Sequence, residues 1–332
     1  MTYTNTMSHR DRMEKCLVGE KTDVTPVAMW RHFPVADQDP ALLARATVEY
    51  QNRFDFDFVK ITPASSYCLV DWGVGTQWKG NPEGTRDYTQ RVVHLPEDWE
   101  KLTPLDPHAG VLQDTLEAVK LIRKNLPAHT PIIQTIFNPL SQAKNLAGQN
   151  TLLDHLRHHP GQLRAGLHTI LETTLKFVEA LRDIPVDGIF YAVQHAQPAL
   201  LSADEFSAFS RKDDLEILAA CDFGWMNVMH LHGDTVHFSA VADYPAQILN
   251  WHDRETGVSI ASGLQSFSGS ACGGLSRDAV MLLGTPQQVR EQALDAIAQS
   301  GGRHFILGTG CVLMTTTPEV NIHAASEAAR KG

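Results

Sequence analysis

The chain has 332 residues, of which 43% are hydrophobic and 20% charged, a balance typical of a globular protein with a sizeable core. Its formal net charge of -10 argues against a nucleic-acid-binding surface, which needs clustered basic residues, but a few local cationic groups could still bind an anionic substrate. The sequence offers neither the long apolar run of a membrane span nor a signal peptide. The five cysteines form no Cys-x-x-Cys pair, which favours reduced thiols and a cytoplasmic location.

Short apolar runs alternate along the chain with longer segments of helical periodicity. The eight runs that we predict as strands are residues 27–31, 56–62, 131–137, 188–193, 225–232, 246–251, 270–274 and 303–307. Helical spacing of apolar residues predicts helices over 111–126 and 163–181. Further helix starts are indicated by capping boxes at Ser202/Glu205 and Thr285/Gln288, and by Thr317-Pro318 before a last helix that ends near Lys331.

This alternation predicts an α/β protein with a single (β/α)₈ TIM barrel domain over residues 1–332. An open, doubly wound sheet is the rival architecture, but no Gly-x-Gly-x-x-Gly motif follows the first strand. Residues 63–108 are rich in Gly, Pro and Trp and have weak periodicity. We therefore expect them to form a long excursion after the second strand, over the mouth of the barrel.

The strongest candidate site is the segment WMNVMHLHGD, residues 225–234. His230 and His232 are two residues apart on a predicted strand, so their side chains point to the same side and could bind a metal such as zinc. Asp234 follows and could orient one of these histidines or contact a substrate. The alternative is that both histidines are merely hydrogen-bonded barrel residues.

A second candidate follows the last predicted strand, where Gly308-Thr309-Gly310 precedes Cys311. Glycines let the backbone turn sharply and approach a ligand closely. Cys311 could complete a three-ligand zinc site with His230 and His232, and the fourth position would stay open, as catalytic zinc requires. The alternative is a buried, unreactive thiol.

Two further groups end predicted strands at the height where barrel enzymes hold their active sites. Arg31 ends the first strand and could bind a carboxylate or phosphate. Tyr191, Gln194 and His195 belong to the fourth strand or the loop beyond it, and could serve as donors or a general acid. The alternatives are a surface ion pair for Arg31 and a packed polar loop for the others.

At these segments the sequence resembles the uroporphyrinogen decarboxylase superfamily, along nearly its whole length. The segments that carry the resemblance are TPVAMWR (25–31), PIIQTIFNPLSQAKNLAG (131–148), GGL (273–275), LGTGCVL (307–313) and TPEVN (317–321). The resemblance implies a (β/α)₈ barrel and one of two activities, porphyrinogen decarboxylation or zinc-dependent methyl transfer with a corrinoid. It also places Arg31 on an arginine that binds a substrate carboxylate.

Two departures from the decarboxylases favour the methyltransferase branch. Val35 stands where they have a second arginine, and residues 62–65 contain no acid where they have an aspartate for the pyrrole nitrogens. The methyltransferases carry zinc ligands in a His-x-Cys motif after the fifth strand and in Gly-Cys after the eighth. His230 and Cys311 match this pattern, and His232 replaces the middle cysteine, so the resemblance implies one zinc ion with these three ligands.

Three functions remain open at this stage. The leading one is a zinc-dependent methyltransferase that moves a methyl group from a corrinoid protein to a zinc-bound thiol, with Arg31 on an anionic end of this small-molecule substrate. No Asp-x-His-x-x-Gly motif is present, so the corrinoid would arrive on a separate partner protein. The alternatives are a decarboxylase of uroporphyrinogen or a related substrate, with His195 as proton donor, and a non-catalytic tetrapyrrole or corrinoid binder. The resemblance also implies a homodimer.

Overall fold

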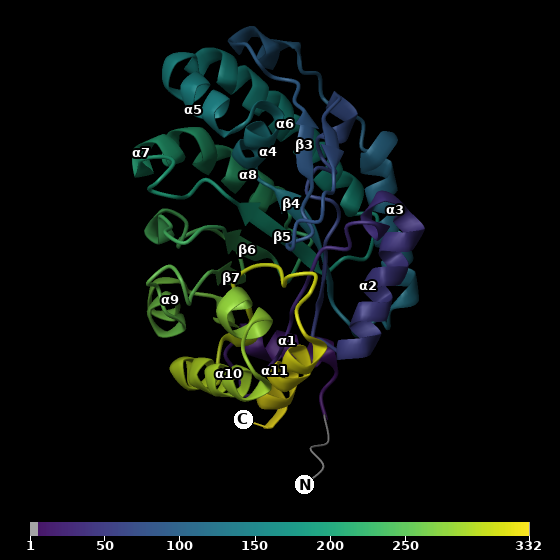
Figure 1. Ribbon diagram of the computed structural model, residues 1–332, viewed down its shortest axis with the longest axis vertical. Coiled ribbons are helices and arrows are strands. Elements are labelled where there is room, and N and C mark those ends of the chain that lie inside the picture. The colour runs from purple at the N-terminus through teal and green to yellow at the C-terminus, as the bar shows by residue number, and fades with distance from the viewer. Residues whose placement is uncertain (1–5, 332) are drawn as a thin grey trace.

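Parallel strands joined by helices form the centre of the protein in the computed structural model, which describes residues 6–331 (Figure 1). The parallel sheet has seven strands in the order β1-β4-β5-β6-β7-β8-β9. They are β1 (Val59–Ile61), β4 (Ile132–Phe137), β5 (Gly188–Val193), β6 (Val228–Leu231), β7 (Ile248–Trp251), β8 (Ser270–Leu275) and β9 (Phe305–Thr309). Each lies within or overlaps a predicted strand, and the curled sheet agrees with the predicted α/β barrel.

The segment predicted as the first strand closes the gap between the two ends of this sheet. Parallel bridges pair Val27 with Leu307 and Arg31 with Leu313, and the backbone N–H of Asp57 donates to the carbonyl of Val27 at 2.8 Å. The segment is not a continuous strand, because the N–H of Val27 donates to the Asp57 carboxylate and not to a neighbouring backbone.

Helices surround the sheet, as the predicted alternation requires. Their bounds are α1 (His9–Leu17), α2 (Pro40–Phe54), α3 (Gly110–Asn125), α4 (Pro139–Ala147), α5 (Gln149–His158), α6 (Pro160–Leu181), α7 (Ala203–Phe206), α8 (Lys212–Ala220), α9 (Ile260–Ser266), α10 (Pro286–Ser300) and α11 (Glu319–Lys331). The predicted capping boxes at Ser202 and Thr285 are both present. Within residues 6–331, none of these helices combines the length and apolarity needed to cross a bilayer.

The long excursion contains more order than predicted. Residues 75–77 and 87–90 pair as an antiparallel ribbon of β2 (Gly75–Gln77) and β3 (Asp87–Gln90). Trp99 anchors the segment to the helical layer, because its ring is fully buried and its Nε1 donates to Nδ1 of His155 in α5 at 2.9 Å. This ribbon was not predicted, because its side chains are largely exposed and therefore lack an alternating apolar pattern.

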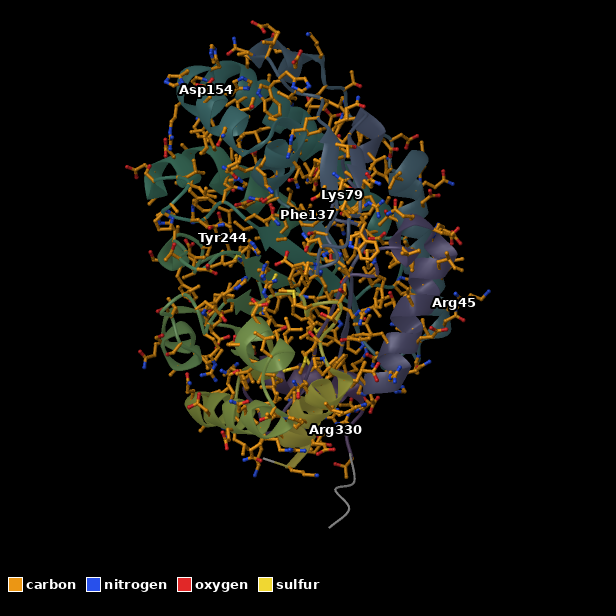
Figure 2. The ribbon with its side chains drawn as sticks, in the orientation of Figure 1. Arg45, Lys79, Phe137, Asp154, Tyr244 and Arg330 are labelled. Carbon is orange, nitrogen blue, oxygen red and sulfur yellow. The ribbon has the colours of Figure 1, made fainter. Side chains whose placement is uncertain are left out.

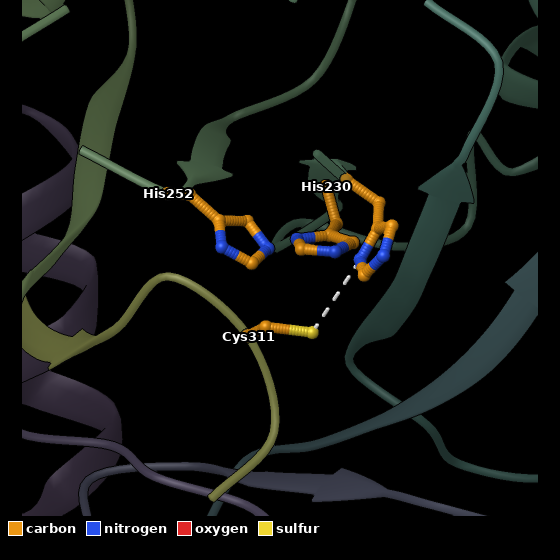
Figure 3. A group of neighbouring side chains, drawn as sticks. His230, His252 and Cys311 are labelled. Atoms are coloured by element: carbon orange, nitrogen blue, oxygen red, sulfur yellow. Dashed lines mark hydrogen bonds between the residues drawn. The ribbon is translucent and has the colours of Figure 1, made fainter. Parts of the chain in front are cut away.

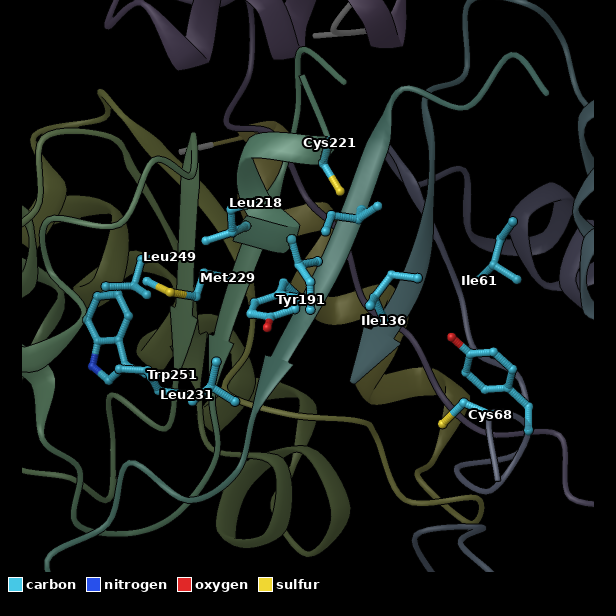
Figure 4. Packing of buried hydrophobic residues seen from close by; sticks show 14 of the residues in the cluster. Ile61, Cys68, Ile136, Tyr191, Leu218, Cys221, Met229, Leu231, Leu249 and Trp251 are labelled. Atoms are coloured by element: carbon cyan, nitrogen blue, oxygen red, sulfur yellow. The ribbon is translucent and has the colours of Figure 1, made fainter. Parts of the chain in front are cut away.

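Side chains of the strands divide between two buried layers according to their alternation. Tyr191, Met229 and Leu231 belong to the layer between sheet and helices (Figure 4). Phe190 and Val228 belong to the second layer, inside the barrel. Exposed charges such as Arg45 and Asp154 lie at the periphery of the molecule (Figure 2). His230 and His232 share the parity of Val228 and therefore face the barrel interior.

Candidate metal centre

Three histidines and one cysteine converge at the carboxyl ends of the strands (Figure 3). His230 lies in β6, His232 and His252 directly follow β6 and β7, and Cys311 lies in the loop after β9. Each offers one ligand atom, and these four atoms all lie within 4.8 Å of one another. Sγ of Cys311 is 3.7 Å from Nδ1 of His232. Tetrahedral zinc with its usual bond lengths holds a nitrogen and a sulfur roughly 3.6 Å apart, so this donor set fits zinc.

Close backbone packing brings the cysteine loop to the histidines. A Cβ on Gly310 would lie 2.6 Å from Cα of His252 and 2.7 Å from the carbonyl oxygen of Trp251. Any larger residue at this position would push Cys311 away from the end of β7. Gly310 therefore allows the loop after β9 to approach the end of β7. The close backbone approach expected from the sequence is thus made to His252 and not directly to a ligand.

Asn250 fixes the orientation of His230. The Nδ2 of Asn250 donates to the carbonyls of Cys272 and Thr309, at 2.8 and 3.0 Å. Its Oδ1 is thus left to accept from Nδ1 of His230, at 2.7 Å. The proton of neutral His230 is therefore on Nδ1, and Nε2 keeps a free lone pair, as metal-binding histidines require.

The charges of the cluster favour a thiolate. Burial alone would raise the pKa of Cys311, but the neighbouring His230, His232 and His252 outweigh it and hold the pKa of Cys311 well below its usual range. Burial works to lower the pKa of His232, and its contact with Cys311 more than reverses that effect. Within residues 6–331, Nε2 of His252 is buried without a hydrogen-bond partner. A buried, unpartnered imidazole nitrogen beside a thiolate is consistent with a metal ligand.

The cluster forms part of the wall of a cavity of about 290 Å³. His230, His232, Cys311 and Gln194 line it together with the ring faces of Trp30 and Phe190. Its remaining lining comes mainly from β1 and the loop after it, from β4, from α4 and from residues 83–88 of the excursion. The excursion thus covers the barrel mouth, as predicted.

Two contacts fix the tip of the excursion over this cavity. Glu83 forms an ion pair with Arg277, which follows β8. The backbone N–H and the hydroxyl of Thr315 both donate to the carbonyl of Pro82, at 2.7 and 3.0 Å. Because the tip is tied to the loops after β8 and β9, it is held over the mouth of the barrel.

Of the predicted site residues, His230, His232, Cys311 and Gln194 are brought together around the cavity. His195 lies next to this group but is only 1% exposed, and both its ring nitrogens lack a partner within residues 6–331. Burial, together with the charge of Lys144, lowers the pKa of His195 to about 3. His195 is therefore neutral at physiological pH and is a poor proton donor.

Three expectations need correction. Tyr191 points outward, where its hydroxyl donates to Oδ1 of Asp214 at 2.7 Å, so it is a structural residue between sheet and helices. Arg31 also faces outward and lines a separate small cavity that includes Tyr50. Asp234 is exposed, and the orienting acceptor of His230 is Asn250.

The sequence-based interpretation missed His252, although a signal existed. His252 directly follows the predicted strand 246–251, and the carboxyl end of a strand is where site residues were sought. Asn250 had no such signal, because a single amide in an apolar strand does not reveal its partners.

A family model described as "Uroporphyrinogen decarboxylase (URO-D)" matches residues 8–332. The chain belongs to this family. Among its relatives, methylcobamide:CoM methyltransferase MtbA of Methanosarcina acetivorans is 22% identical over 325 residues, which cover 96% of this chain and 93% of the relative. Methylcobamide:CoM methyltransferase MtaA of Methanosarcina barkeri is also 22% identical, over 88% of this chain and 85% of the relative.

Solved structures with the same fold include a methyltransferase from Methanosarcina mazei, with a TM-score of 0.82 and 19% identity over 97% of this chain and 98% of that chain. A B12-independent methionine synthase from a Shewanella species matches with a TM-score of 0.60 and 12% identity, over 93% of this chain and 94% of that chain. The predicted family resemblance and barrel fold are thus confirmed.

Proposed function

We propose that this family member is a zinc-dependent methyltransferase that transfers a methyl group from a corrinoid protein to a thiol. The observation that carries the proposal is the convergence of three imidazoles and one thiol within 4.8 Å at the wall of a large cavity. The two relatives are named as methylcobamide:CoM methyltransferases, which supports the same reaction class.

In this proposal His230, His232 and Cys311 hold the zinc ion, as the sequence predicted. Zinc supplies a positive charge that lowers the pKa of a bound thiol and so provides a thiolate nucleophile at neutral pH. His252 offers a fourth ligand atom within 4.8 Å of the other three, so it would compete with a substrate thiol for a bound zinc ion. Substitution of His252 should therefore weaken zinc binding while making the site more open to thiols.

The other residues of the cavity position the substrate and exclude water. Asn250 keeps His230 in one tautomer, and the rings of Trp30 and Phe190 supply an apolar part of the cavity wall. The corrinoid would be presented at the covered mouth by a separate partner protein. We also keep the homodimer as part of the proposal. The proposal does not include the predicted contact of Arg31 with an anionic end of the substrate, because Arg31 lines a separate cavity.

Metal analysis of the purified chain tests the site. We expect one zinc per chain, and loss of that zinc in His232→Ala and Cys311→Ala. His237→Ala is the matched control, because His237 is a half-buried histidine of the same segment whose Nε2 donates to the carbonyl of Leu201, outside the cluster. Full zinc content in both cluster variants would refute the site.

Activity is tested with methylcobalamin and 2-mercaptoethanol or CoM. The carbon–cobalt bond breaks, the methyl group bonds to sulfur, and the electron pair stays on cobalt, so cob(I)alamin absorbance and a thioether should appear together. Conversion of uroporphyrinogen to coproporphyrinogen by the same protein would instead favour the decarboxylase.

A further inference from the structure

Two lysines line the cavity without an acidic partner. Lys60 lies in β1 and Lys144 in α4, on different parts of the cavity wall. Within residues 6–331 neither ammonium group has a carboxylate within 4.0 Å. The negative charge that acts on Lys60 is that of Cys311 in the cluster, and the neighbouring charge that acts on Lys144 is the cation of Arg91. Lys60 is only 7% exposed, and its Nζ lies 4.6 Å from the ring centroid of Phe190.

Such lysines are unusual because burying an unpaired cation is unfavourable. Burial lowers the pKa of Lys60 to about 7 and that of Lys144 to about 8, which is the direct sign of this cost. The excess of unpaired cations in the cavity does not follow from the composition of the chain, which is acidic overall, with 38 acidic residues against 28 lysines and arginines. Its single lining carboxylate, Glu83, is already paired with Arg277.

The same protein pairs another buried cation completely. Arg12, 1% exposed, forms ion pairs with both Asp23 and Asp57. Arg12 is thus a buried cation with two carboxylate partners, whereas Lys60 and Lys144 face the cavity without one. An external anion would supply the missing partner for each of them.

We propose that the cavity takes a substrate with two separate acidic groups, one paired with Lys60 and the other with Lys144. This inference rests on the proposed function in taking the cavity as the substrate site. The two lysines come from different elements and have different surroundings, since Lys60 lies against Phe190 and Trp30 whereas Lys144 lies near Arg91 and His195. A single small anion would leave one of them unpaired.

Calorimetric titration of the zinc-loaded protein with simple acids tests the inference without requiring turnover. The probes are succinate, glutarate and adipate, compared with butyrate as a monoacid. We expect at least one diacid to bind about tenfold or more tightly than butyrate. Lys60→Met and Lys144→Met should each remove this advantage, while Lys120→Met, at an exposed site on α3, should retain it.

Thermal unfolding provides a second measurement that separates a binding role from a structural one. Methionine has similar length but no charge, so each cavity variant should unfold at a higher temperature than the parent in the absence of ligand. Equal affinity for diacids and butyrate, or unchanged diacid affinity in either lysine variant, would overturn the inference. Absence of zinc or of methyl transfer, with lysine-dependent diacid binding intact, would instead count against the proposed function alone.

Discussion

Replacement of Asn250 by alanine probes how the cluster is held in place. Asn250 is completely buried and makes three hydrogen bonds, one from the ring of His230 and two to the carbonyls of Cys272 and Thr309. The alanine variant leaves the Nδ1 proton of His230 without an acceptor, and the imidazole becomes free to rotate or to change tautomer. We therefore expect two losses, one in zinc affinity and one in stability.

The loss of zinc affinity and the loss of stability can be measured separately. Removal of the group that orients a metal-bound histidine lowers metal affinity by about 10- to 100-fold, which corresponds to roughly 1.4–2.8 kcal/mol. The unsatisfied buried groups should lower the free energy of unfolding of the metal-free protein by about 1–3 kcal/mol. Zinc affinity is measured by competition with a chromophoric chelator, and stability by urea unfolding in EDTA.

Asn227→Ala is the matched control for this experiment. Asn227 is 3% exposed and binds the backbone N–H of Ile189 and the carbonyl of Cys221, at the opposite end of β6 from the cluster. It should lower stability by a similar amount and leave zinc affinity unchanged. If Asn250→Ala and Asn227→Ala lose stability equally and both keep the parent zinc affinity, the orienting role assigned to Asn250 is refuted.

Three further predictions address the metal, a buried acid and the packing of the excursion. Zinc at 100 times its Kd should add about 2.7 kcal/mol to the free energy of unfolding, measured as a rise in Tm that EDTA reverses; an unchanged Tm would contradict the site. Burial raises the pKa of Asp214 to about 6, so the stability that its protonated form contributes is complete below about pH 4 and is lost as pH rises through 6. Relative to Asp214→Asn, the parent should therefore lose about 3 kcal/mol between pH 4 and 7, and parallel stability curves in urea would disprove this. A Cβ on Gly166 would lie 2.5 Å from the ring of Trp99, so Gly166→Ala should cost about 1–3 kcal/mol, whereas Gly161→Ala on the same helix meets nothing within 4 Å and should show no loss by the same assay.

The order of the elements and most of the cluster were predictable because they depend on local patterns. Alternating apolar runs and helical segments define a barrel without knowledge of contacts, and the two-residue spacing of His230 and His232 fixes their common direction. Cys311 was found by its place after the last strand. The members of the His/Cys cluster that were predicted thus follow from their places at strand ends, since the closure of a parallel barrel brings those ends together.

The errors arose where the direction of a side chain had to be known. Tyr191 and Arg31 were placed in the site by their height along a strand, but their parity directs them outward, to Asp214 and to the cavity beside Tyr50. Phe190, one residue before Tyr191, faces the barrel interior. The same parity test, applied to each strand in turn, would have removed both residues from the site.

Lys60 and Asn250 illustrate a different limit. Each acquires its significance from groups far away in the chain. Lys60 matters because no carboxylate among the described residues pairs with it, and Asn250 because it joins β7 to β8 and β9. No local pattern reports such absences or such long-range contacts.

The ion pair between Glu83 and Arg277 has a kinetic consequence for any molecule that enters the barrel. The excursion tip is fastened to the loops after β8 and β9, and we expect ligand entry to require this latch to open. Rapid-mixing experiments should then show an observed binding rate that reaches a plateau at high ligand concentration, at the rate of opening. Glu83→Gln should raise that plateau. The rate of ligand binding could thus be changed at the rim of the barrel without any change to the residues of the cluster.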